Sequence, residues 1–540
     1  MAFLPRPMRV AVALFLAIAA AIVVTWWWLG APVALPASPL GPGEKLYCMS
    51  YSPFRGRQTP FDRTLRIDAA QIDDDLARLA PVTDCVRTYS IELGLDQVAG
   101  IAERHGIKVI QGIWLGRERA RNRVEIDTAV ALATRHPGTV RALVAGNEVL
   151  LRGELSADDL AALIREIKRR VAVPVTYADV WEFWLRNRAV ADAVDFVTIH
   201  ILPYWEDIPI AADQAAAHVA EIRRMVAEAF PGKEVLLGEV GWPSAGRMRE
   251  RALPSPVNQA RVIEDVLDLA RREGFHANVI EAFDQPWKRQ LEGTVGGHWG
   301  LLDGASRVRK FAWGVPLANH PAWPWQAAAG ILLAAATFLA AGAARGRAAP
   351  PSRAQWFGVV TIALGAGVLI GWAIADVPPA SLGAGGWLHS LAMLAVASVA
   401  PVAGAAALMR NIAVPSFSDV LDHPSDGGAT GVGLALGACW VALCAIATEV
   451  ALGLAFDPRY RDFPFAPLGA AAPPFVILAL LGARGRRGLA EILMAAVLAL
   501  ATLFIVWNEG PANWQSLCLC AVFVVLIVTL LRPRAAPSSE

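Results

Sequence analysis

The sequence predicts an α/β domain of eight strand–helix repeats, followed by an all-α domain of membrane-spanning helices. Between residues 44 and 318, short apolar segments alternate with amphipathic helical segments, which is the pattern of βα units on a parallel sheet. From Trp323 onward the chain is almost entirely apolar. Over all 540 residues, 55% are hydrophobic and only 18% are charged, a balance that an ordinary soluble protein does not have.

The N-terminal segment, residues 1–31, is predicted to be an uncleaved membrane anchor. Two arginines precede an apolar run from Val10 to Leu29, which is about as long as a bilayer-spanning helix requires. A cleaved signal peptide is the alternative, but no clean small-x-small cleavage site precedes Trp26. A Pro-rich linker, residues 32–43, then leads into the soluble domain.

The soluble domain, residues 44–318, contains eight predicted strands. They are residues 45–52, 85–90, 108–115, 140–148, 173–178, 194–200, 234–242 and 278–284. Helical segments separate them; residues 71–80, for example, have apolar side chains spaced for one buried face. Eight such units in about 275 residues match the count and size of a (β/α)₈ TIM barrel.

Charge and cysteine content limit the function classes. The formal net charge of +1 argues against a nucleic-acid partner. Among six cysteines there is no CxxC motif or Cys/His cluster, so no metal site is predicted. Cys48 and Cys85 lie near two successive strands and could form a disulfide in an extracytoplasmic domain, but we expect two buried thiols.

The C-terminal part, residues 319–540, is predicted to be a seven-helix transmembrane domain. Its apolar spans are about 323–344, 355–375, 386–409, 431–456, 468–483, 489–507 and 514–531. Arginine-rich connections at residues 345–353, 484–487 and 532–534 fall on one side, and Arg410 begins the remaining loop there. Because cytoplasmic loops are enriched in Lys and Arg, the soluble domain is placed on the opposite side of the membrane.

Two strand ends carry a glutamate in the same setting. LVAGNEVLL (143–151) and VLLGEVGWPS (235–244) each run from an apolar strand through glycine to a glutamate, Glu148 and Glu239. Barrel active sites lie at the C-terminal strand ends, so both carboxylates are expected to face one mouth. The other polar and aromatic residues near strand ends are predicted to bind substrate: Asn147, Tyr51, Arg87, Tyr89, Trp114, Tyr177, His200, Tyr204, Trp242, Glu281, Asp284 and Trp287.

Two carboxylates that flank one bond are the apparatus of glycoside cleavage, and aromatic faces stack against sugar rings. The domain offers seven tryptophans for this purpose: Trp114, Trp181, Trp184, Trp205, Trp242, Trp287 and Trp299. Any one of them is more often a core residue, and a lone histidine at a strand end, such as His200, is often a hydrogen-bonded core residue.

The soluble domain resembles glycoside hydrolase family 17, the β-1,3-glucanase family among retaining (β/α)₈ glycosidases, over about residues 44–312. GNE and GEVGWPS carry the resemblance, with YSPFRGRQTP (51–60), VRTYS (86–90), EAFDQPWK (281–288) and GGHWGLLD (296–303). It implies Glu148 as the acid/base, Glu239 as the nucleophile of a covalent glycosyl intermediate, and Asn147 as a hydrogen-bond partner of the sugar 2-OH. Tyr204 is expected to orient Glu239, and Glu281 to hold the acid/base network or a substrate hydroxyl.

The covalent intermediate permits hydrolysis or transfer, and the membrane setting favours transfer. The chain is similar to membrane-linked bacterial β-(1,3)/(1,6)-glucan biosynthesis proteins, which implies a retaining transglycosylase that forms β-1,6 linkages or branches on β-1,3-glucan. It also implies a multi-pass protein of the bacterial inner membrane with a periplasmic catalytic domain. The expected partners are a β-glucan oligosaccharide or polysaccharide, membrane lipid and a separate membrane glucan synthase.

Two alternatives stay open. One is a membrane-anchored β-1,3-glucan hydrolase, which would use the same carboxylates. The other is a non-catalytic glucan-binding or export membrane protein, although its helices carry few ionisable residues for a transport path, Glu449 and Glu491 being the clearest. Glu491 lies near a basic loop and is expected to extend toward the membrane surface. No cofactor is expected.

Overall fold

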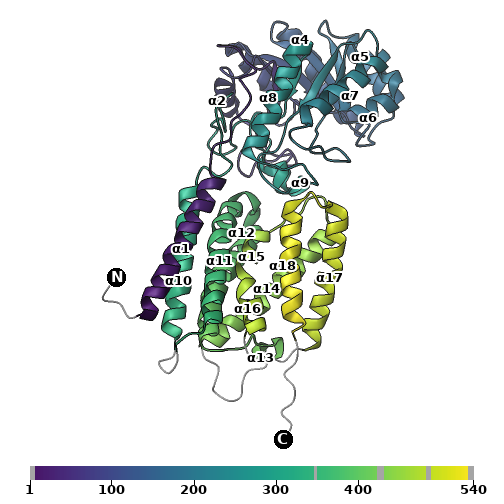
Figure 1. Ribbon diagram of the computed structural model, residues 1–540. Coiled ribbons are helices and arrows are strands. Elements are labelled where there is room, and N and C mark those ends of the chain that lie inside the picture. Colours follow the sequence, from purple (N-terminus) through teal and green to yellow (C-terminus); the bar gives the residue numbers. More distant parts are fainter. Residues whose placement is uncertain (1–5, 346–349, 422–430, 482–487, 533–540) are drawn as a thin grey trace. The chain divides into compact units, whose positions relative to one another are not determined.

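A computed structural model describes residues 6–345, 350–421, 431–481 and 488–532, and the chain divides into two compact units. One unit is Val33–Leu317, and the other combines Met1–Pro32 with Ala318–Glu540. The ribbon in Figure 1 labels the elements of both units.

The unit Val33–Leu317 is a closed barrel of eight parallel strands in the order β1 to β8, which confirms the predicted fold class. The strands are β1 Cys48–Ser50, β2 Cys85–Arg87, β3 Lys108–Ile113, β4 Val140–Asn147, β5 Val175–Val180, β6 Val197–His200, β7 Val235–Val240 and β8 Ala277–Val279. Each lies within or overlaps its predicted segment, but most are shorter. Residues beyond the last ladder pair belong to the loops that build the barrel mouth.

Helices follow the strands and cover the barrel wall. They are α2 Ala69–Leu79, α3 Val98–Arg104, α4 Arg119–Arg135, α5 Ala157–Lys168, α6 Trp181–Arg186, α7 Ala215–Ala229, α8 Pro256–Glu273 and α9 Arg289–Gly296. Three short 3₁₀ helices complete the unit: η1 Leu95–Gln97, η2 Arg188–Asp192 and η3 Pro286–Lys288.

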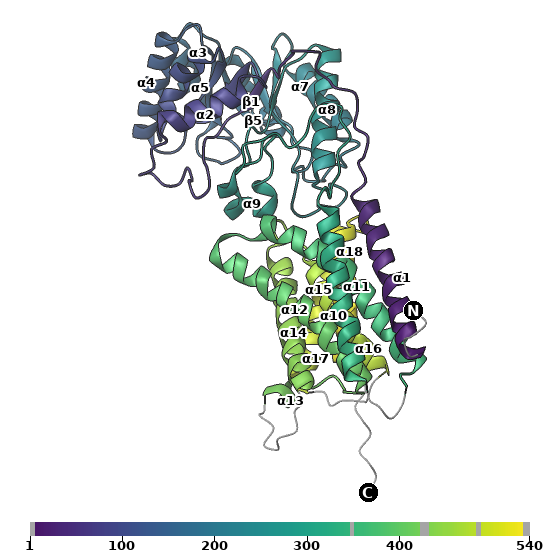
Figure 2. The ribbon, with the colours of Figure 1, turned by 90° about the vertical axis from the view of Figure 1, so that its left-hand side faces the viewer.

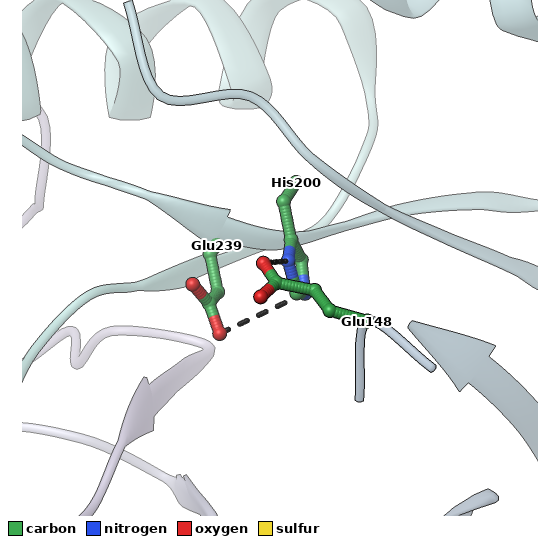
Figure 3. Close-up of side chains that lie close together, drawn as sticks. All are labelled: Glu148, His200 and Glu239. Carbon is green, nitrogen blue, oxygen red and sulfur yellow. Dashed lines mark hydrogen bonds and ion pairs between the residues drawn. The ribbon is translucent and has the colours of Figure 1, made fainter. Parts of the chain in front are cut away.

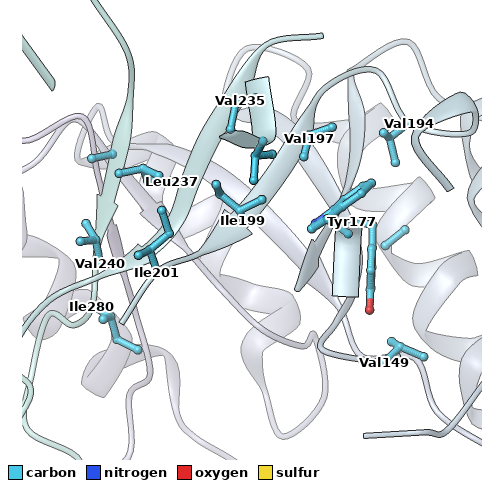
Figure 4. Packing of buried hydrophobic residues seen from close by; sticks show 14 of the residues in the cluster. Val149, Tyr177, Val194, Val197, Ile199, Ile201, Val235, Leu237, Val240 and Ile280 are labelled. Atoms are coloured by element: carbon cyan, nitrogen blue, oxygen red, sulfur yellow. The ribbon is translucent and has the colours of Figure 1, made fainter. Parts of the chain in front are cut away.

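The core lies between the strands and these helices. Val197, Ile199 and Leu237 are fully buried, and Figure 4 shows their side chains packed along neighbouring strands. Parallel strands are buried on both faces, which explains why the strand segments of the sequence are nearly continuous apolar runs.

Cys48 and Cys85 form a disulfide, which corrects the expectation of two buried thiols. The ladder pairs Met49 with Val86, so the preceding residues of the two strands are neighbours as well, with Cα atoms 4.3 Å apart. The sequence reveals neither this register nor the resulting distance between the two thiols.

The segment predicted to be a linker packs against the barrel in the structure. The N–H group of Val33 donates to the carbonyl of Leu317 at 2.9 Å, and Leu35 and Leu40 lie against buried residues of the barrel unit. Its apolar residues, interspersed with prolines, gain more from burial than from solvent exposure. The compact barrel unit therefore begins at Val33 rather than at residue 44.

A buried carboxylate, Asp75 of α2, joins three segments of the barrel unit. Its Oδ1 accepts hydrogen bonds from Arg55 Nη2 at 2.5 Å and Arg307 Nε at 3.1 Å, and its Oδ2 accepts from the Tyr51 hydroxyl at 3.1 Å. The Arg307 guanidinium also lies 3.5 Å from the centre of the Phe283 ring. One charge thus ties the loop after β1 and the segment after β8 to α2.

The second unit is helical. Its described helices are α1 Arg6–Leu29, α10 Trp323–Ala344, α11 Arg353–Ala380, α12 Gly383–Met409, α13 Phe417–Leu421, α14 Gly431–Phe456, α15 Phe465–Ala471, α16 Pro473–Leu481, α17 Leu489–Glu509 and α18 Trp514–Leu530. Six of them are long and apolar enough to cross a membrane, namely α1, α10, α11, α12, α14 and α17. The α15–α16 pair and α18 are shorter apolar helices.

Prolines divide the fifth predicted span, residues 468–483, into two short helices. The helix is interrupted between Ala471 and Pro473, because a proline has no N–H group to continue the hydrogen-bond ladder. The basic residues expected in the loops at 346–347, 484–487 and 534 lie outside the described residues.

Close helix contacts and buried polar groups organise this unit. In Figures 1 and 2, α1 runs beside α10. A Cβ atom on Gly330 of α10 would lie 2.0 Å from the Gly367 carbonyl of α11, so glycine permits this approach. Glu491 is fully buried, and its carboxylate accepts the N–H groups of Gly488 and Phe417, each at 2.9 Å. This corrects the expectation that Glu491 extends toward the membrane surface.

We expect Asp75→Asn to destabilise the barrel unit by about 3–5 kcal/mol, since Arg307 would stay buried without its charged partner. Hydrogen exchange of barrel peptides in the detergent-solubilised full-length protein measures the free energy of opening. Asp73→Asn on the same helix is the matched control, because the exposed ion pair of Asp73 with Arg104 contributes little. Equal opening free energies in the two variants would contradict the role given to Asp75.

Candidate active site

Two glutamates and a histidine meet at the C-terminal ends of three strands. Glu148 follows β4, His200 ends β6, and Glu239 lies near the end of β7. His200 Nδ1 is 2.9 Å from Glu148 Oε1, and His200 Nε2 is 3.7 Å from Glu239 Oε1 (Figure 3). One carboxylate oxygen of Glu148 and one of Glu239 lie within 4.8 Å of each other. The structure therefore brings the two predicted carboxylates together across the barrel.

The chain turns sharply where β4 ends. Gly146 has φ +94° and Glu148 has φ +53°, and the ladder between β4 and β5 shifts register between Val144 and Asn147. A glutamate in the left-handed region is uncommon, and the surrounding contacts must hold it there. The Glu148 N–H group, for example, donates to the Ala178 carbonyl at 2.7 Å. The turn directs the Glu148 side chain toward His200, where 26% of the side chain remains exposed.

Glu239 receives its donors on one oxygen. Arg87 Nη1 donates to Glu239 Oε1 at 2.7 Å, and the Tyr89 hydroxyl donates to the same oxygen at 2.8 Å. Among the described residues, no donor lies within hydrogen-bond distance of Glu239 Oε2. This oxygen is therefore available to react, while the other fixes the carboxylate in place.

Positive neighbours decide the charge of Glu239. Burial alone would raise the pKa of Glu239, but His200, Arg87 and Lys288 together with the Tyr89 hydrogen bond lower it to about 2. The carboxylate is 5% exposed and is nevertheless ionised at neutral pH. An ionised, oriented carboxylate with one free oxygen has the properties of a nucleophile.

Asn147 is held by the same arginine. Arg87 Nη2 donates to Asn147 Oδ1, which fixes the amide so that its Nδ2 group is the remaining donor. None of the described residues accepts a hydrogen bond from Nδ2, and the side chain lies next to Glu148 at the mouth. A substrate hydroxyl is a suitable acceptor for this group.

Glu281 forms a second buried ion pair near Glu239. Lys288 Nζ lies 2.9 Å and 3.0 Å from the two carboxylate oxygens of Glu281. Burial raises the pKa of Glu281 to about 7, although the charge of Lys288 opposes this shift. The sequence pattern indicated Glu281 but not Lys288, which ends the EAFDQPWK segment and also lowers the pKa of Glu239.

Five of the predicted aromatic residues remain partly exposed, namely Tyr89, Trp114, Trp181, Trp205 and Trp287. Trp114 lines a cavity of about 420 Å³ together with Gly116, Arg117 and Arg152. Trp287 packs edge-on against Phe61, with ring centroids 5.6 Å apart. Partly exposed aromatic rings can stack against sugar rings.

Five other residues that the sequence predicts to bind substrate have interior side chains. Each is at most 4% exposed, and each bonds to a protein group instead. Tyr51 donates to Asp75, Tyr177 to Asp179, Tyr204 to the Arg247 carbonyl, and Trp242 to the Leu253 carbonyl, while Asp284 accepts from Lys310. They support the strand ends, because polar groups in a core need partners. Trp184 and Trp299 are core residues as well.

Two consequences follow for individual predictions. The hydroxyl that donates to Glu239 belongs to Tyr89, whereas Tyr204 was expected to orient this carboxylate. His200 is fully buried, as a core histidine would be, yet it lies between the two glutamates. Its role is therefore more specific than its position in the sequence indicated.

Sequence reasoning missed two buried carboxylates that hold the mouth. Glu125 of α4 accepts from Ser90 Oγ at 2.5 Å and from the Trp114 N–H group at 3.0 Å. Burial raises the pKa of Glu125 to about 7 and that of Asp179, which bonds to Tyr177, to about 6. Both residues look like ordinary helix or strand positions, so the sequence carried no signal for them.

The Glu148, His200 and Glu239 group also has the ligand types of a metal site, with ligand atoms within 4.8 Å of one another. However, the Arg87 guanidinium already places a positive charge 2.7 Å from Glu239 Oε1, and this charge disfavours a second cation beside the same carboxylate. We therefore interpret the group as a pair of carboxylates on either side of a histidine rather than as a metal centre.

Residues 48–300 match the family model of the BtgE/BtgC glycoside hydrolase domain. Glucan 1,3-beta-glucosidase BGL2 of Candida albicans is 26% identical over 256 residues, which cover 43% of this chain and 83% of that protein. The probable beta-glucosidase btgE of Aspergillus fumigatus is 28% identical over 225 residues, which cover 40% of this chain and 39% of that protein.

Two solved structures are similar to part of the chain. The glycoside hydrolase family 17 β-1,3-glucanosyltransferase from Rhizomucor miehei has 25% sequence identity, covers 50% of this chain and 96% of its own, and gives a TM-score of 0.44. An endo-laminarinase from Formosa Hel1_33_131 has 19% identity, covers 48% of this chain and 83% of its own, and gives a TM-score of 0.43. Residues 48–300 thus match a glycoside hydrolase domain, and the relatives indicate that the protein is an enzyme of the glycosidase and transglycosylase class.

Proposed function

We propose that the protein is a retaining transglycosylase that acts on β-1,3-glucan, with Glu239 as nucleophile and Glu148 as acid/base. The observation that carries this proposal is the spacing of the carboxylates, whose oxygens lie within 4.8 Å. Retaining enzymes keep their two carboxyl groups about 5–5.5 Å apart, whereas inverting enzymes leave room for a water molecule at about 6.5–9.5 Å.

The reaction has two steps. In the first, Glu239 Oε2 attacks the anomeric carbon, the glycosidic bond breaks, and the Glu148 carboxyl gives its proton to the leaving oxygen. In the second, an acceptor hydroxyl gives its proton to the Glu148 carboxylate and attacks the anomeric carbon, which releases Glu239. The partly exposed Glu148 can exchange protons in this way, while the buried Glu239 stays ionised.

Substrate identity rests on similarity and on the site. The family match and the Candida albicans relative, named for a glucan 1,3-beta-glucosidase, favour β-1,3-glucan. In this proposal Asn147 Nδ2 donates to a sugar hydroxyl next to the scissile bond, and the partly exposed rings of Trp114 and Trp287 contact sugar rings.

The helical unit supports transfer over hydrolysis in this proposal. Six of its described helices have the length and composition to cross a membrane. We place them in the inner membrane of a bacterium with the barrel in the periplasm, since arginine-rich loops are typical of the cytoplasmic side. An enzyme held there can modify β-1,3-glucan delivered by a separate membrane synthase and can add β-1,6 linkages or branches.

The direct test is to incubate the full-length protein in detergent with linear β-1,3-gluco-oligosaccharides. We expect products longer than the substrate, with new β-1,6 signals by NMR, because a sugar hydroxyl replaces water in the second step. Mass spectrometry measures product length, and Glu239→Gln is the negative control. Shorter products alone would instead show a hydrolase, and an active Glu239→Gln variant would contradict the proposed nucleophile.

The two carboxylates can be distinguished by azide rescue. Glu148→Ala should lower turnover by about 10²–10⁴-fold, because the leaving oxygen loses its proton donor. Added azide should restore turnover of an activated aryl glucoside and give a β-glycosyl azide. Glu239→Ala should instead give the α-glycosyl azide, because azide then attacks from the side that the nucleophile occupied. NMR of the products reads the configuration, and identical anomers from both variants would contradict the roles.

Arg87 should control the acidic limb of the pH profile. The pKa of Glu239 is about 2, so in the native enzyme the nucleophile remains ionised down to strongly acidic pH. Arg87→Met removes one of the positive charges that oppose burial, so the pKa rises and kcat/KM is lost at a higher pH. Measuring kcat/KM for a dinitrophenyl glucoside between about pH 3 and pH 8 checks this. An unmoved acidic limb, with both proteins folded by circular dichroism, would contradict it.

A further inference from the structure

Arg152 lies four residues beyond Glu148, outside the carboxylate pair, and its guanidinium contacts the ends of two strands. Its Nε and Nη2 donate to the Asn147 carbonyl at 3.2 Å and 3.0 Å. Nη2 also donates to the Leu115 carbonyl at 2.9 Å, which follows β3. One planar group therefore connects the exits of β3 and β4, and its fixed fork of N–H donors suits two carbonyls at once.

One face of the guanidinium and its remaining edge are also occupied. Its central carbon lies 4.2 Å from the centre of the Trp114 ring, and Nη1 pairs with Glu154. The side chain is 21% exposed, and it forms part of the wall of the 420 Å³ cavity that Trp114 also lines. These contacts leave the guanidinium little freedom to move.

The carbonyl that Arg152 holds belongs to the residue directly before the acid/base. Glu148 has φ +53°, a conformation that an L-residue keeps only when its surroundings impose it. The backbone N–H group of Arg152 also donates to the Glu148 carbonyl at 2.8 Å. Arg152 thus constrains the Asn147–Glu148 turn through both its backbone and its side chain.

We propose that Arg152 is a positioning residue, which holds the Asn147–Glu148 turn so that the Glu148 carboxyl stays aligned with the leaving oxygen. This inference rests on the proposed function, in which Glu148 is the acid/base. Arg152 does not touch the reacting atoms. It acts through the turn, as Arg87 acts on the Asn147 side chain from within the barrel.

A substrate comparison separates positioning from general damage. A glucan needs a proton on its leaving oxygen, whereas dinitrophenolate leaves without one, so only the first substrate depends on the position of Glu148. In full-length Arg152→Met we expect kcat/KM for a β-1,3-gluco-oligosaccharide to fall by about 10- to 100-fold, as small misplacements of a catalytic group do. For a dinitrophenyl β-glucoside of the same chain length it should stay near the wild-type value.

Arg223→Met is the matched control. Arg223 of α7 also stacks on an aromatic ring, with its guanidinium 4.1 Å from the centre of Phe275. It also pairs with Glu273, the last residue of α8, at 3.6 Å. Its substitution should leave both kcat/KM values unchanged. Arg152→Lys keeps one charge without the fork of donors, so it should show the same split between substrates to a smaller degree.

The outcomes are distinct. The positioning role is wrong if Arg152→Met and Arg152→Lys each lose as much kcat/KM on the dinitrophenyl glucoside as on the oligosaccharide. It is also wrong if both variants behave like Arg223→Met on the two substrates. If Arg152→Met does not fold, the split in Arg152→Lys decides alone. If the wild-type protein cleaves neither substrate, the proposed function itself fails, which is a different result from an inactive variant.

Discussion

The Arg87 guanidinium is the group on which the organisation of the site depends. It is 2% exposed and binds Glu239 on β7 and Asn147 on β4 from its own position at the end of β2. A cation so deeply buried is stable only beside an ionised carboxylate, and the carboxylate is ionised partly because of the cation. The ends of β2, β4 and β7 are distant in the chain. They are held together because the buried cation and the buried carboxylate each need the charge of the other.

Burial by itself does not set the pKa values of the carboxyl groups in the site. Neighbouring charges decide the direction in which each pKa shifts. Glu239 and Glu281 are both nearly inaccessible, yet the pKa of Glu239 is lowered to about 2 and that of Glu281 is raised to about 7. The difference is that Glu239 faces His200, Arg87 and Lys288, while Glu281 faces Lys288 and is also close to other carboxylates. A barrel mouth can thus lower the pKa of one buried acid and raise that of another.

The carboxylates stand on short segments that the rest of the domain supports. Arginines hold Asn147 from two sides, Arg87 at its amide and Arg152 at its carbonyl. Around them, buried carboxylates such as Glu125 and Asp75 tie together the loops after several strands. Many residues that the sequence placed at the mouth belong to this supporting layer, where a hydroxyl or indole N–H bonds to the backbone or to an acid.

The sequence by itself determined the barrel, since the alternation of apolar strands and amphipathic helices depends only on local periodicity. It also determined which glutamates meet, because Glu148 and Glu239 occupy the ends of parallel strands, and all such ends face one mouth. Tertiary structure alone decided which side chains point into that mouth and which are buried, as Tyr89 and Tyr204 show. It likewise decided the Cys48–Cys85 bond and the roles of Arg152 and Glu125. These depend on strand register and on partners far apart in the chain, and neither leaves a periodic signal in the sequence.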